Sequence, residues 1–346
     1  MFCRDSFFKA SPRRSFLVGV AAMLVTASCT QIQNVLGINS NSTSESDQVL
    51  NVAIWSNYLS KDMAEKFSKE TGIKLNFSNY ATNEELLAKI QTGGSGIDVA
   101  VPSDYMVAVM AKLNLLEKLD LAQISEFKNI DSRFLDKEFD PKNSYSIPYS
   151  FGTTGLAVNR ELYKEPVKSW KDVFLNPALA GKFSLLDDVR EDIGAVLRMN
   201  GHSLNSTDVA ELQQAKEVLM KIKSAAKMFT SDSGMALVNK EVMVAHMYSS
   251  DALQASAKLK GQVEFVIPEE GATTYLDNLV IVKGAKHNKA AHQFLNFLVS
   301  KDAVLDFVKR IKSGPIRKDI QNELPPDLRD SLVLFPTEKV RASLES

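Results

Sequence analysis

Short apolar runs alternate with stretches of helical periodicity from Val49 onward, and this alternation constrains the fold more than any other feature. Ser60 is suited to be a helix N-cap and Gly72 stands where that helix would end, while Thr82 and Glu85 form a capping-box pattern. We expect strands at 50–55, 73–77, 98–101, 155–159, 182–186, 242–247, 263–267 and 275–282, and helices at 60–71, 189–199, 209–222 and 290–298. This order predicts an α/β protein with a largely parallel sheet.

The composition is that of a globular protein. Of the 346 residues, 45% are hydrophobic and 24% are charged, and this length leaves room for about two domains. The formal net charge is -1 and no long run of Lys or Arg occurs, so the basic surface that a phosphate backbone requires is missing from the composition. We therefore expect no nucleic-acid partner.

The first 28 residues have the order of an export signal. Four basic residues precede an apolar run at 16–27, and small residues follow that run. A run of about 12 apolar residues is too short to span a bilayer, so a permanent transmembrane helix is not expected. Removal of residues 1–28 takes away four basic residues and one acidic residue, which changes the formal net charge from -1 to -4.

The segment Val25-Thr-Ala-Ser-Cys29 resembles the lipobox of bacterial lipoproteins, in which the cysteine is acylated and becomes the first mature residue. The chain has two cysteines, Cys3 and Cys29, so Cys29 would otherwise be an unpaired thiol in an oxidising compartment. The alternative is an ordinary cleavage site beside an incidental cysteine. Residues 29–48 are rich in Ser and Asn and are expected to form a tether. These features predict a periplasmic lipoprotein anchored to the membrane through Cys29.

Several ordered segments carry a resemblance to a known family. They are Leu50-Asn-Val-Ala-Ile-Trp-Ser-Asn-Tyr58, Phe67-Ser-Lys-Glu-Thr-Gly-Ile-Lys74, Val101-Pro-Ser-Asp-Tyr105, Tyr145-Ser-Ile-Pro-Tyr149, Ser169-Trp-Lys-Asp172, Asp187-Asp-Val-Arg-Glu191, Tyr248-Ser-Ser-Asp251 and Tyr275-Leu-Asp277. In order and spacing they resemble the periplasmic spermidine/putrescine-binding proteins of ABC transporters.

The resemblance implies a two-lobed periplasmic-binding-protein fold of type II, with the ligand in a cleft between the lobes. Lobe one would comprise 49–151 and 277–325, and lobe two would comprise 152–276 and 326–346. The protein would capture a polyamine such as putrescine or spermidine, without a cofactor or a metal, and deliver it to the permease subunits of an ABC-type importer. We expect a monomer.

Polyamine capture requires a particular combination of side chains. Carboxylates pair with the ammonium groups, while aromatic rings cover the methylenes and add cation–π attraction of about 0.5 to 2 kcal/mol. The resemblance places such residues at the ends of the first and third strands and at three later segments. The implied ligand-binding residues are Trp55, Ser56, Tyr58, Ser103, Tyr105, Asp188, Glu191, Tyr248, Asp251, Tyr275 and Asp277.

Six of these residues also have a simpler structural explanation. Trp55 could be a core aromatic, and Ser103, Asp188 and Asp251 could be helix caps, with Glu191 completing a capping box. Asp277 lies inside an apolar run, where an unpaired carboxylate would cost several kcal/mol, so it needs a cation or hydrogen-bond donors. For Asp277 the alternative is a structural hydrogen bond at a hinge.

Transport of a polyamine has three alternatives. The four histidines follow no metal-ligand spacing, and neither a Gly-x-Ser-x-Gly motif nor a phosphate loop is present, so an enzyme is not expected. A binding lipoprotein for another small cation, or a sensor that is not coupled to transport, remains open. Tyr248 and Tyr275 stand where spermidine-preferring relatives have tryptophan, and Asn57 stands where an acid is common, so the preferred amine also remains open.

Overall fold

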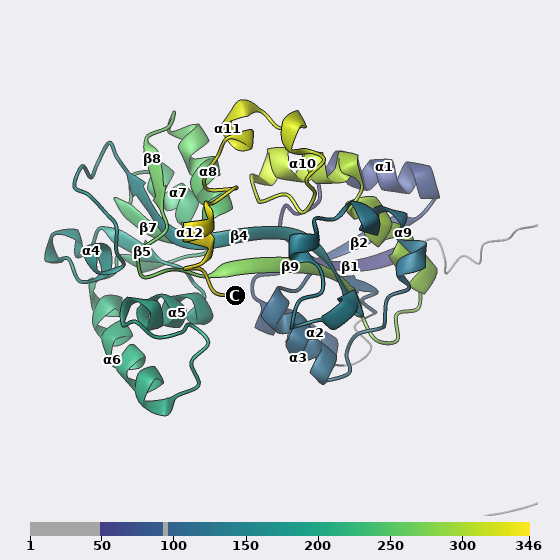
Figure 1. Ribbon diagram of the computed structural model, residues 1–346, viewed down its shortest axis with the longest axis horizontal. Coiled ribbons are helices and arrows are strands. Elements are labelled where there is room, and N and C mark those ends of the chain that lie inside the picture. The colour runs from purple at the N-terminus through teal and green to yellow at the C-terminus, as the bar shows by residue number, and fades with distance from the viewer. Residues whose placement is uncertain (1–48, 93–95) are drawn as a thin grey trace, which may run out of the picture. The chain divides into compact units, whose positions relative to one another are not determined.

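Nine strands form one continuous sheet in the computed structural model, which describes residues 49–92 and 96–346 (Figure 1). The order is β2-β1-β3-β9-β4-β7-β5-β6, and β8 pairs with β4. Neighbours β1 and β2, β1 and β3, β5 and β7, and β5 and β6 run parallel, whereas β4 and β9 run antiparallel to each of their neighbours. The α/β class expected from the sequence is confirmed, but the sheet is mixed rather than largely parallel, because β4 and β9 run antiparallel to their neighbours.

The strands are β1 (Val49–Trp55), β2 (Lys74–Tyr80), β3 (Val99–Ala100), β4 (Ser146–Asn159), β5 (Phe183–Leu185), β6 (Met228–Phe229), β7 (Val244–Tyr248), β8 (Val263–Val266) and β9 (Thr274–Ile281). The α-helices are α1 (Lys61–Thr71), α2 (Asn83–Gln91), α3 (Asp104–Lys112), α4 (Lys171–Phe174), α5 (Val189–Met199), α6 (Val209–Ala225), α7 (Ser233–Val238), α8 (Ser249–Lys258), α9 (Asn288–Leu298), α10 (Lys301–Ile311), α11 (Pro326–Arg329) and α12 (Glu338–Arg341).

The predicted helix boundaries are confirmed where capping residues mark them. The Ser60 hydroxyl accepts a hydrogen bond from the Met63 amide at 3.2 Å, and Gly72 ends α1 with a φ of 76°, which glycine adopts without steric cost. Thr82 accepts from the Glu85 amide at 3.1 Å. Glu85 in turn accepts from the Ala81 amide at 2.8 Å, so it reaches back one residue further than the simplest capping box would require.

Two strands cross from one lobe to the other and connect them (Figure 1). The first part of β4 pairs with β9, and its second part, Thr154–Val158, pairs with β7. The sequence predicted a strand only at 155–159, and this prediction was too short. Residues 150–153 lack a clear apolar alternation, but pairing with β9 keeps them extended.

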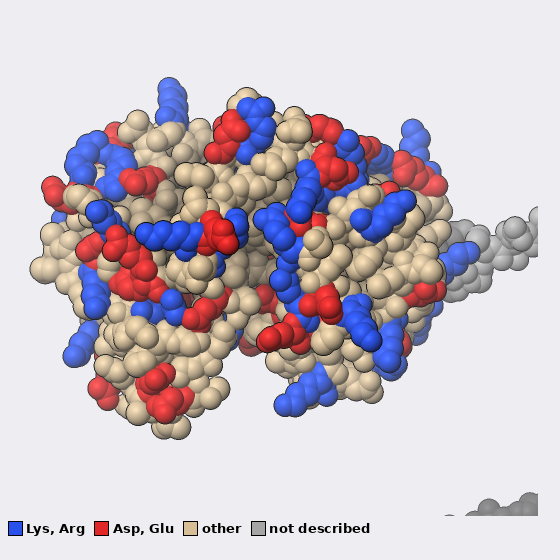
Figure 2. All heavy atoms as spheres, viewed as in Figure 1, with Lys and Arg blue, Asp and Glu red and all other residues tan. Residues whose placement is uncertain are grey.

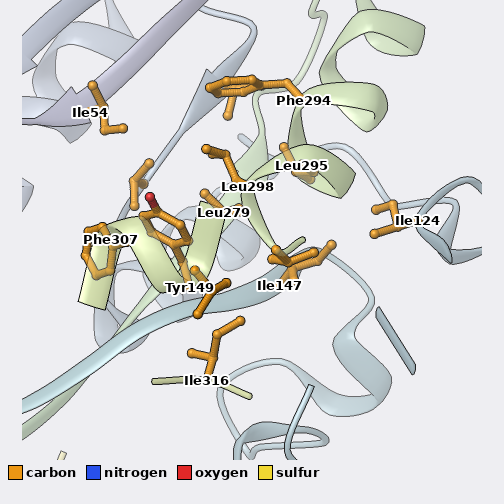
Figure 3. Packing of buried hydrophobic residues seen from close by; sticks show 14 of the residues in the cluster. Ile54, Ile124, Ile147, Tyr149, Leu279, Phe294, Leu295, Leu298, Phe307 and Ile316 are labelled. Atoms are coloured by element: carbon orange, nitrogen blue, oxygen red, sulfur yellow. The ribbon is translucent and has the colours of Figure 1, made fainter. Parts of the chain in front are cut away.

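Each lobe has apolar cores on both faces of its part of the sheet. In lobe one, α1, α9 and α10 cover one face and α2 and α3 cover the other; side chains alternate accordingly, since Ile54 faces the first core and Ala53 the second. Figure 3 shows Ile54, Leu279 and Phe294 among the side chains of the first core. In lobe two, α5 and α6 pack on one face, and α7 and α8 pack on the other.

The C-terminal tail departs from the expected division. We expected 326–346 to join lobe two, but Leu328 and Leu334 are buried in the core of lobe one, because their apolar side chains fill the space beside α10 and the 316–324 segment. The tail reaches lobe two only at its last residues. There Leu344 packs on the core, and the Glu345 carbonyl accepts from the Thr274 amide at 2.7 Å.

The expected export signal at 1–28, the tether at 29–48 and Cys29 lie outside the residues that the structure describes. In the described ranges, 49–92 and 96–346, no helix combines the length and the apolarity needed to cross a membrane.

Candidate binding site between the lobes

A cavity of about 620 Å³ lies between the two lobes, beside the crossing strands. It receives residues from the ends of β1 and β3 in lobe one, from the first turns of α5 and α8 in lobe two, and from β9. The carboxyl ends of strands are where open α/β sheets place ligands. All of the residues predicted for the site line this cavity: Trp55, Ser56, Tyr58, Ser103, Tyr105, Asp188, Glu191, Tyr248, Asp251, Tyr275 and Asp277.

The lining of the cavity is strongly acidic. Among the described residues that line it, seven are acidic, namely Glu85, Asp104, Asp187, Asp188, Glu191, Asp251 and Asp277, and one, Arg190, is basic. The cavity walls also limit contact with water, so the negative charges are screened less than they would be on an open surface. This arrangement favours a ligand that carries positive charge.

The lobe-one wall is built where β1 ends. Trp55 is the last residue of β1, and its indole nitrogen donates to the Val101 carbonyl at 2.8 Å. Its ring centroid lies 4.5 Å from that of Tyr80 and 6.4 Å from that of Tyr58. The chain turns at Asn57, which has a φ of 66°, and this turn directs Tyr58 back toward the cavity. Trp55 is half-buried, so it is both part of the packing and part of the wall.

Asp277 is the most deeply buried acid of the site, since the residue is only 3% exposed. The Tyr58 hydroxyl donates to one carboxylate oxygen at 2.6 Å, and the Ser103 hydroxyl donates to the other at 2.8 Å. Both donors are neutral, and no ion pair joins Asp277 to a cation in the described part of the chain. Burial therefore raises the pKa of Asp277 to about 7, although the two hydrogen bonds oppose this rise.

The sequence position of Ser103 is compatible with two roles, a helix cap and a residue of the binding site. It is the N-cap residue of α3, but its side chain makes no capping hydrogen bond. Its hydroxyl instead connects the Asn83 side chain, which donates to it at 3.1 Å, with Asp277. The Ser103 backbone amide also donates to the side-chain oxygen of Asn83 at 3.0 Å, and this hydrogen bond fixes the orientation of the Asn83 side-chain amide.

On the lobe-two wall, the N-terminus of α5 holds two acids. Asp188 is the N-cap, and its carboxylate accepts from the Arg190 amide at 3.0 Å and from the Glu191 amide at 3.3 Å. Its other oxygen lies 3.5 Å from the Tyr248 hydroxyl, which donates to it. The capping explanation is correct for Asp188, and it is compatible with a place in the cavity wall because this side chain is half-buried.

Glu191 does not complete a capping box. Its carboxylate accepts from the Thr154 hydroxyl at 2.9 Å, on the crossing strand β4, and the residue is 7% exposed. Burial raises the pKa of Glu191, whereas the nearby His246 ring opposes that rise. His246 is itself buried beside Asp192, with 3.2 Å between its Nδ1 and a carboxylate oxygen. Glu191 is therefore held by a neutral donor, like Asp277.

Two tyrosines cover the cavity beside the crossing strands. The rings of Tyr248 and Tyr275 pack edge to face with centroids 5.5 Å apart. The Tyr275 ring lies against the backbone of Gly152 on β4, in the space where the Cβ of any other residue would stand. Glycine is required at residue 152 for this close approach.

Asp251 lies in the first turn of α8, but it is not the cap. Its side chain has no hydrogen-bond or ion-pair partner among the residues at 49–92 and 96–346. Burial raises its pKa to about 6, and Asp232 adds to this rise. An acid that faces a cavity without a partner is available to a ligand.

Sequence reasoning missed several residues of the wall. Gln254 lies one turn after Asp251 on α8, and this spacing could have indicated it. Asn83 was concealed by the capping pattern of its neighbours, and Arg190 by the cap motif that surrounds it. The second tryptophan, Trp170, lies away from the cleft: it is 1% exposed in the lobe-two core, where its indole nitrogen donates to the Gly271 carbonyl.

Comparisons with known proteins agree with this architecture. The family model for bacterial extracellular solute-binding proteins matches residues 62–331. The putrescine/cadaverine-binding protein of Pseudomonas aeruginosa is 32% identical over 304 residues, which cover 84% of this chain and 86% of the relative. The type II, two-lobed fold that the resemblance implied is confirmed.

Solved structures extend the same relationship. The PotD substrate-binding protein of a spermidine/putrescine ABC transporter from Streptococcus pneumoniae aligns with a TM-score of 0.75 at 29% identity, covering 86% of this chain and 92% of that one. A lipoprotein of Treponema pallidum aligns with a TM-score of 0.71 at 30% identity, covering 76% of this chain and 84% of that one. The chain therefore belongs to the bacterial extracellular solute-binding protein family.

Proposed function

We propose that this protein captures a polyamine in the cleft between its lobes and delivers it to an ABC-type importer. The observation that carries this proposal is the set of cleft acids that form no ion pair with a described residue: Asp277 and Glu191 accept hydrogen bonds from neutral hydroxyls, and the Asp251 side chain has no partner among the described residues. Charged groups shielded from water are costly unless a cation or a metal pairs with them. Ammonium groups of a ligand would supply the missing charge.

Aromatic residues beside these acids support an amine with a hydrocarbon chain. Tyr58 adjoins Asp277 through its hydroxyl, and Tyr275 and Tyr248 form an edge-to-face pair between the acids of the two lobes. Their faces can cover methylenes and attract an ammonium group, with about 0.5 to 2 kcal/mol for each cation–π contact. A sugar is neutral and would leave the buried acids without a positive partner, and an anion would be repelled by the seven acids of the wall.

The relatives support the same ligand class. One relative is described as binding putrescine and cadaverine, and another belongs to a spermidine/putrescine transporter. By this likeness the ligand would be a di- or triamine, the partner would be the permease of an ABC importer, and the protein would act by binding rather than by catalysis. The names of these relatives therefore favour organic cations as the partners of the acids.

Calorimetric titration of the mature protein tests this function. The panel comprises putrescine, cadaverine, spermidine and spermine, together with 1,4-butanediol, which has the length of putrescine but hydroxyl groups in place of its ammonium groups. We expect saturable binding of at least one amine with a stoichiometry of one, and no binding of the diol. Binding of the diol as tightly as putrescine, or of none of the amines, would rule out capture of a cation.

We also propose that the mature protein is periplasmic and anchored to the membrane through acylated Cys29. The support comes from the lipobox-like segment and from the relationship to a lipoprotein of Treponema pallidum. Replacement of the thiol in Cys29→Ser removes the atom that would carry the lipid, so labelling with radioactive palmitate should disappear and the protein should leave the membrane fraction. Equal labelling of parent and variant would contradict the anchor.

A further inference from the structure

Arg190 is the basic residue among the described residues of the cavity wall, and the other charged residues of this wall are acidic. Its backbone belongs to lobe two, but its side chain extends to a residue of lobe one. The backbone lies in the first turn of α5 in lobe two, where Asp188 accepts from its amide. The guanidinium carbon lies 4.5 Å from the centroid of the Tyr105 ring, which belongs to α3 in lobe one. The contact therefore joins the two lobes across the cleft.

Both partners of this contact are held from behind by their own lobes. On the lobe-two side, Arg190 donates from Nη2 to the Asn205 side chain at 2.8 Å. On the lobe-one side, the Tyr105 hydroxyl donates to Glu84 in the first turn of α2 at 3.1 Å. Side chains that are fixed in this way lose less rotational freedom when the lobes meet, so more of the attraction contributes to closure.

The positive charge of Arg190 also acts on an acid of lobe one. Asp104 is 5% exposed and adjoins Tyr105, and Arg190 is the cation that lowers its pKa against the rise caused by burial. When the lobes separate, Asp104 loses this compensating charge. Closure therefore brings a positive charge close to Asp104 and to the Tyr105 ring. Asp277, Glu191 and Asp251 remain available to pair with the ligand.

We infer that Arg190 is a latch between the lobes: it stabilises the closed cleft by contacting the Tyr105 ring and by attracting the nearby Asp104 carboxylate, and it slows escape of the ligand without binding the ligand. The inference rests on the proposed function only for the identity of the enclosed molecule. A cation–π contact of ordinary strength corresponds to about a 2-fold to 30-fold change in an equilibrium constant. Because a latch acts on closure, the change should fall on the dissociation rate and should be similar for putrescine and spermidine.

The first experiment measures release of radiolabelled putrescine and spermidine from the protein after addition of excess unlabelled amine. Arg190→Met keeps most of the side-chain length but removes the charge, and it should accelerate release of both amines by about 2-fold to 30-fold. Arg190→Lys keeps a cation and should recover part of the loss. Arg133→Met is the matched control, since Arg133 lies over the Phe134 ring at 5.4 Å within lobe one, and it should leave release unchanged.

A double-mutant cycle separates a latch from a direct ligand contact. If Arg190 acts through Tyr105, the variant Arg190→Met/Tyr105→Leu should release amine little faster than Tyr105→Leu alone. Tyr105→Phe keeps the ring and should retain the coupling. Unchanged release by Arg190→Met, additive effects in the double variant, or faster release of only one of the two amines would overturn the latch.

A second measurement needs no ligand and so distinguishes failure of the latch from failure of the proposed function. Spin labels at Lys112→Cys on α3 and Lys216→Cys on α6 report the separation of the lobes, in a chain whose Cys3 and Cys29 are replaced by serine; both labelled residues are exposed. In the ligand-free protein, Arg190→Met should shift the distance distribution toward longer separations. An identical distribution for parent and Arg190→Met would refute the latch, whether or not the parent binds an amine.

Discussion

Asp277 illustrates how much a single residue reveals before and after the fold is known. Its place in an apolar run indicated that the carboxylate needs partners, and this prediction is confirmed. The partners themselves, Tyr58 and Ser103, lie 219 and 174 residues away along the chain, so no local pattern could have identified them. The structural and the ligand-binding explanations of Asp277 are compatible, because two neutral donors orient the carboxylate without neutralising it.

At this scale we predict that Asp277→Asn weakens amine binding strongly. The change keeps the shape of the side chain and deletes the charge, and loss of one partner of a buried charge pair costs about 2 to 5 kcal/mol, or roughly 30-fold to several-thousand-fold in affinity. Asp188→Asn is the matched control, since asparagine can still cap α5, and it should cost less. Calorimetry with putrescine checks both variants; parent-like affinity of Asp277→Asn would contradict charge pairing.

The same substitution should stabilise the empty protein in a pH-dependent way. The native state keeps a proton on Asp277 up to its pKa of about 7, whereas the unfolded state loses it near the ordinary value of 3.8, so the free energy of unfolding falls as pH rises between these values. The free energy of unfolding of Asp277→Asn does not fall in this way, because asparagine does not titrate. We expect it to be more stable than the parent at pH 8, by up to about 4 kcal/mol, and close to the parent at pH 4.

Thermal or urea unfolding of ligand-free parent and variant at the two pH values measures this difference. If Asp277→Asn is more stable than the parent by the same amount at pH 4 and at pH 8, the charge of Asp277 is not the cause of the difference.

Among the helices and strands, the sequence predicted those bounds that depend on residues near each other in the chain. The bounds of α5 agree with the sequence prediction, because Asp188 begins the helix and its apolar period continues to Met199. The length of β4 was missed because residues 150–153 are kept extended by pairing with β9. The tail was misassigned because its leucines fit a core that other segments build. Pairing and packing between distant segments decided both cases.

The crossing strands lead to a prediction about Gly152. In Gly152→Ala the new methyl group would occupy the place of the Tyr275 ring, so the ring must move and the wall of the cavity changes. We expect a loss of about 1 to 3 kcal/mol in the free energy of unfolding and at least tenfold weaker amine binding. Gly194→Ala in α5 is the control, because its nearest neighbours would lie at 3.4 and 3.9 Å and alanine favours a helix.

Urea unfolding and calorimetry measure the two effects of Gly152→Ala separately. Tight putrescine binding by this variant would show that the position of Tyr275 is unimportant for the site.

At the scale of the whole molecule, the charge of the cleft differs from that of the surface. Acidic and basic side chains are interspersed over the face seen in Figure 2, whereas the described wall of the cavity has seven acids and Arg190. A net charge near zero could not indicate this separation. Nor could the sequence indicate the Arg190–Tyr105 contact, because it forms only when two separately folded lobes meet.

In the proposed function, an amine is held in the cleft beside Trp55. The chain has two tryptophans, and Trp55 lines the cavity while Trp170 is buried in the lobe-two core. The most direct measurement is a fluorescence titration with putrescine of two variants, Trp170→Phe and Trp55→Phe, in which a single tryptophan emits. We predict a saturable change in Trp170→Phe, whose emission comes from Trp55, and almost none in Trp55→Phe. A saturable change in Trp55→Phe with none in Trp170→Phe would contradict the account.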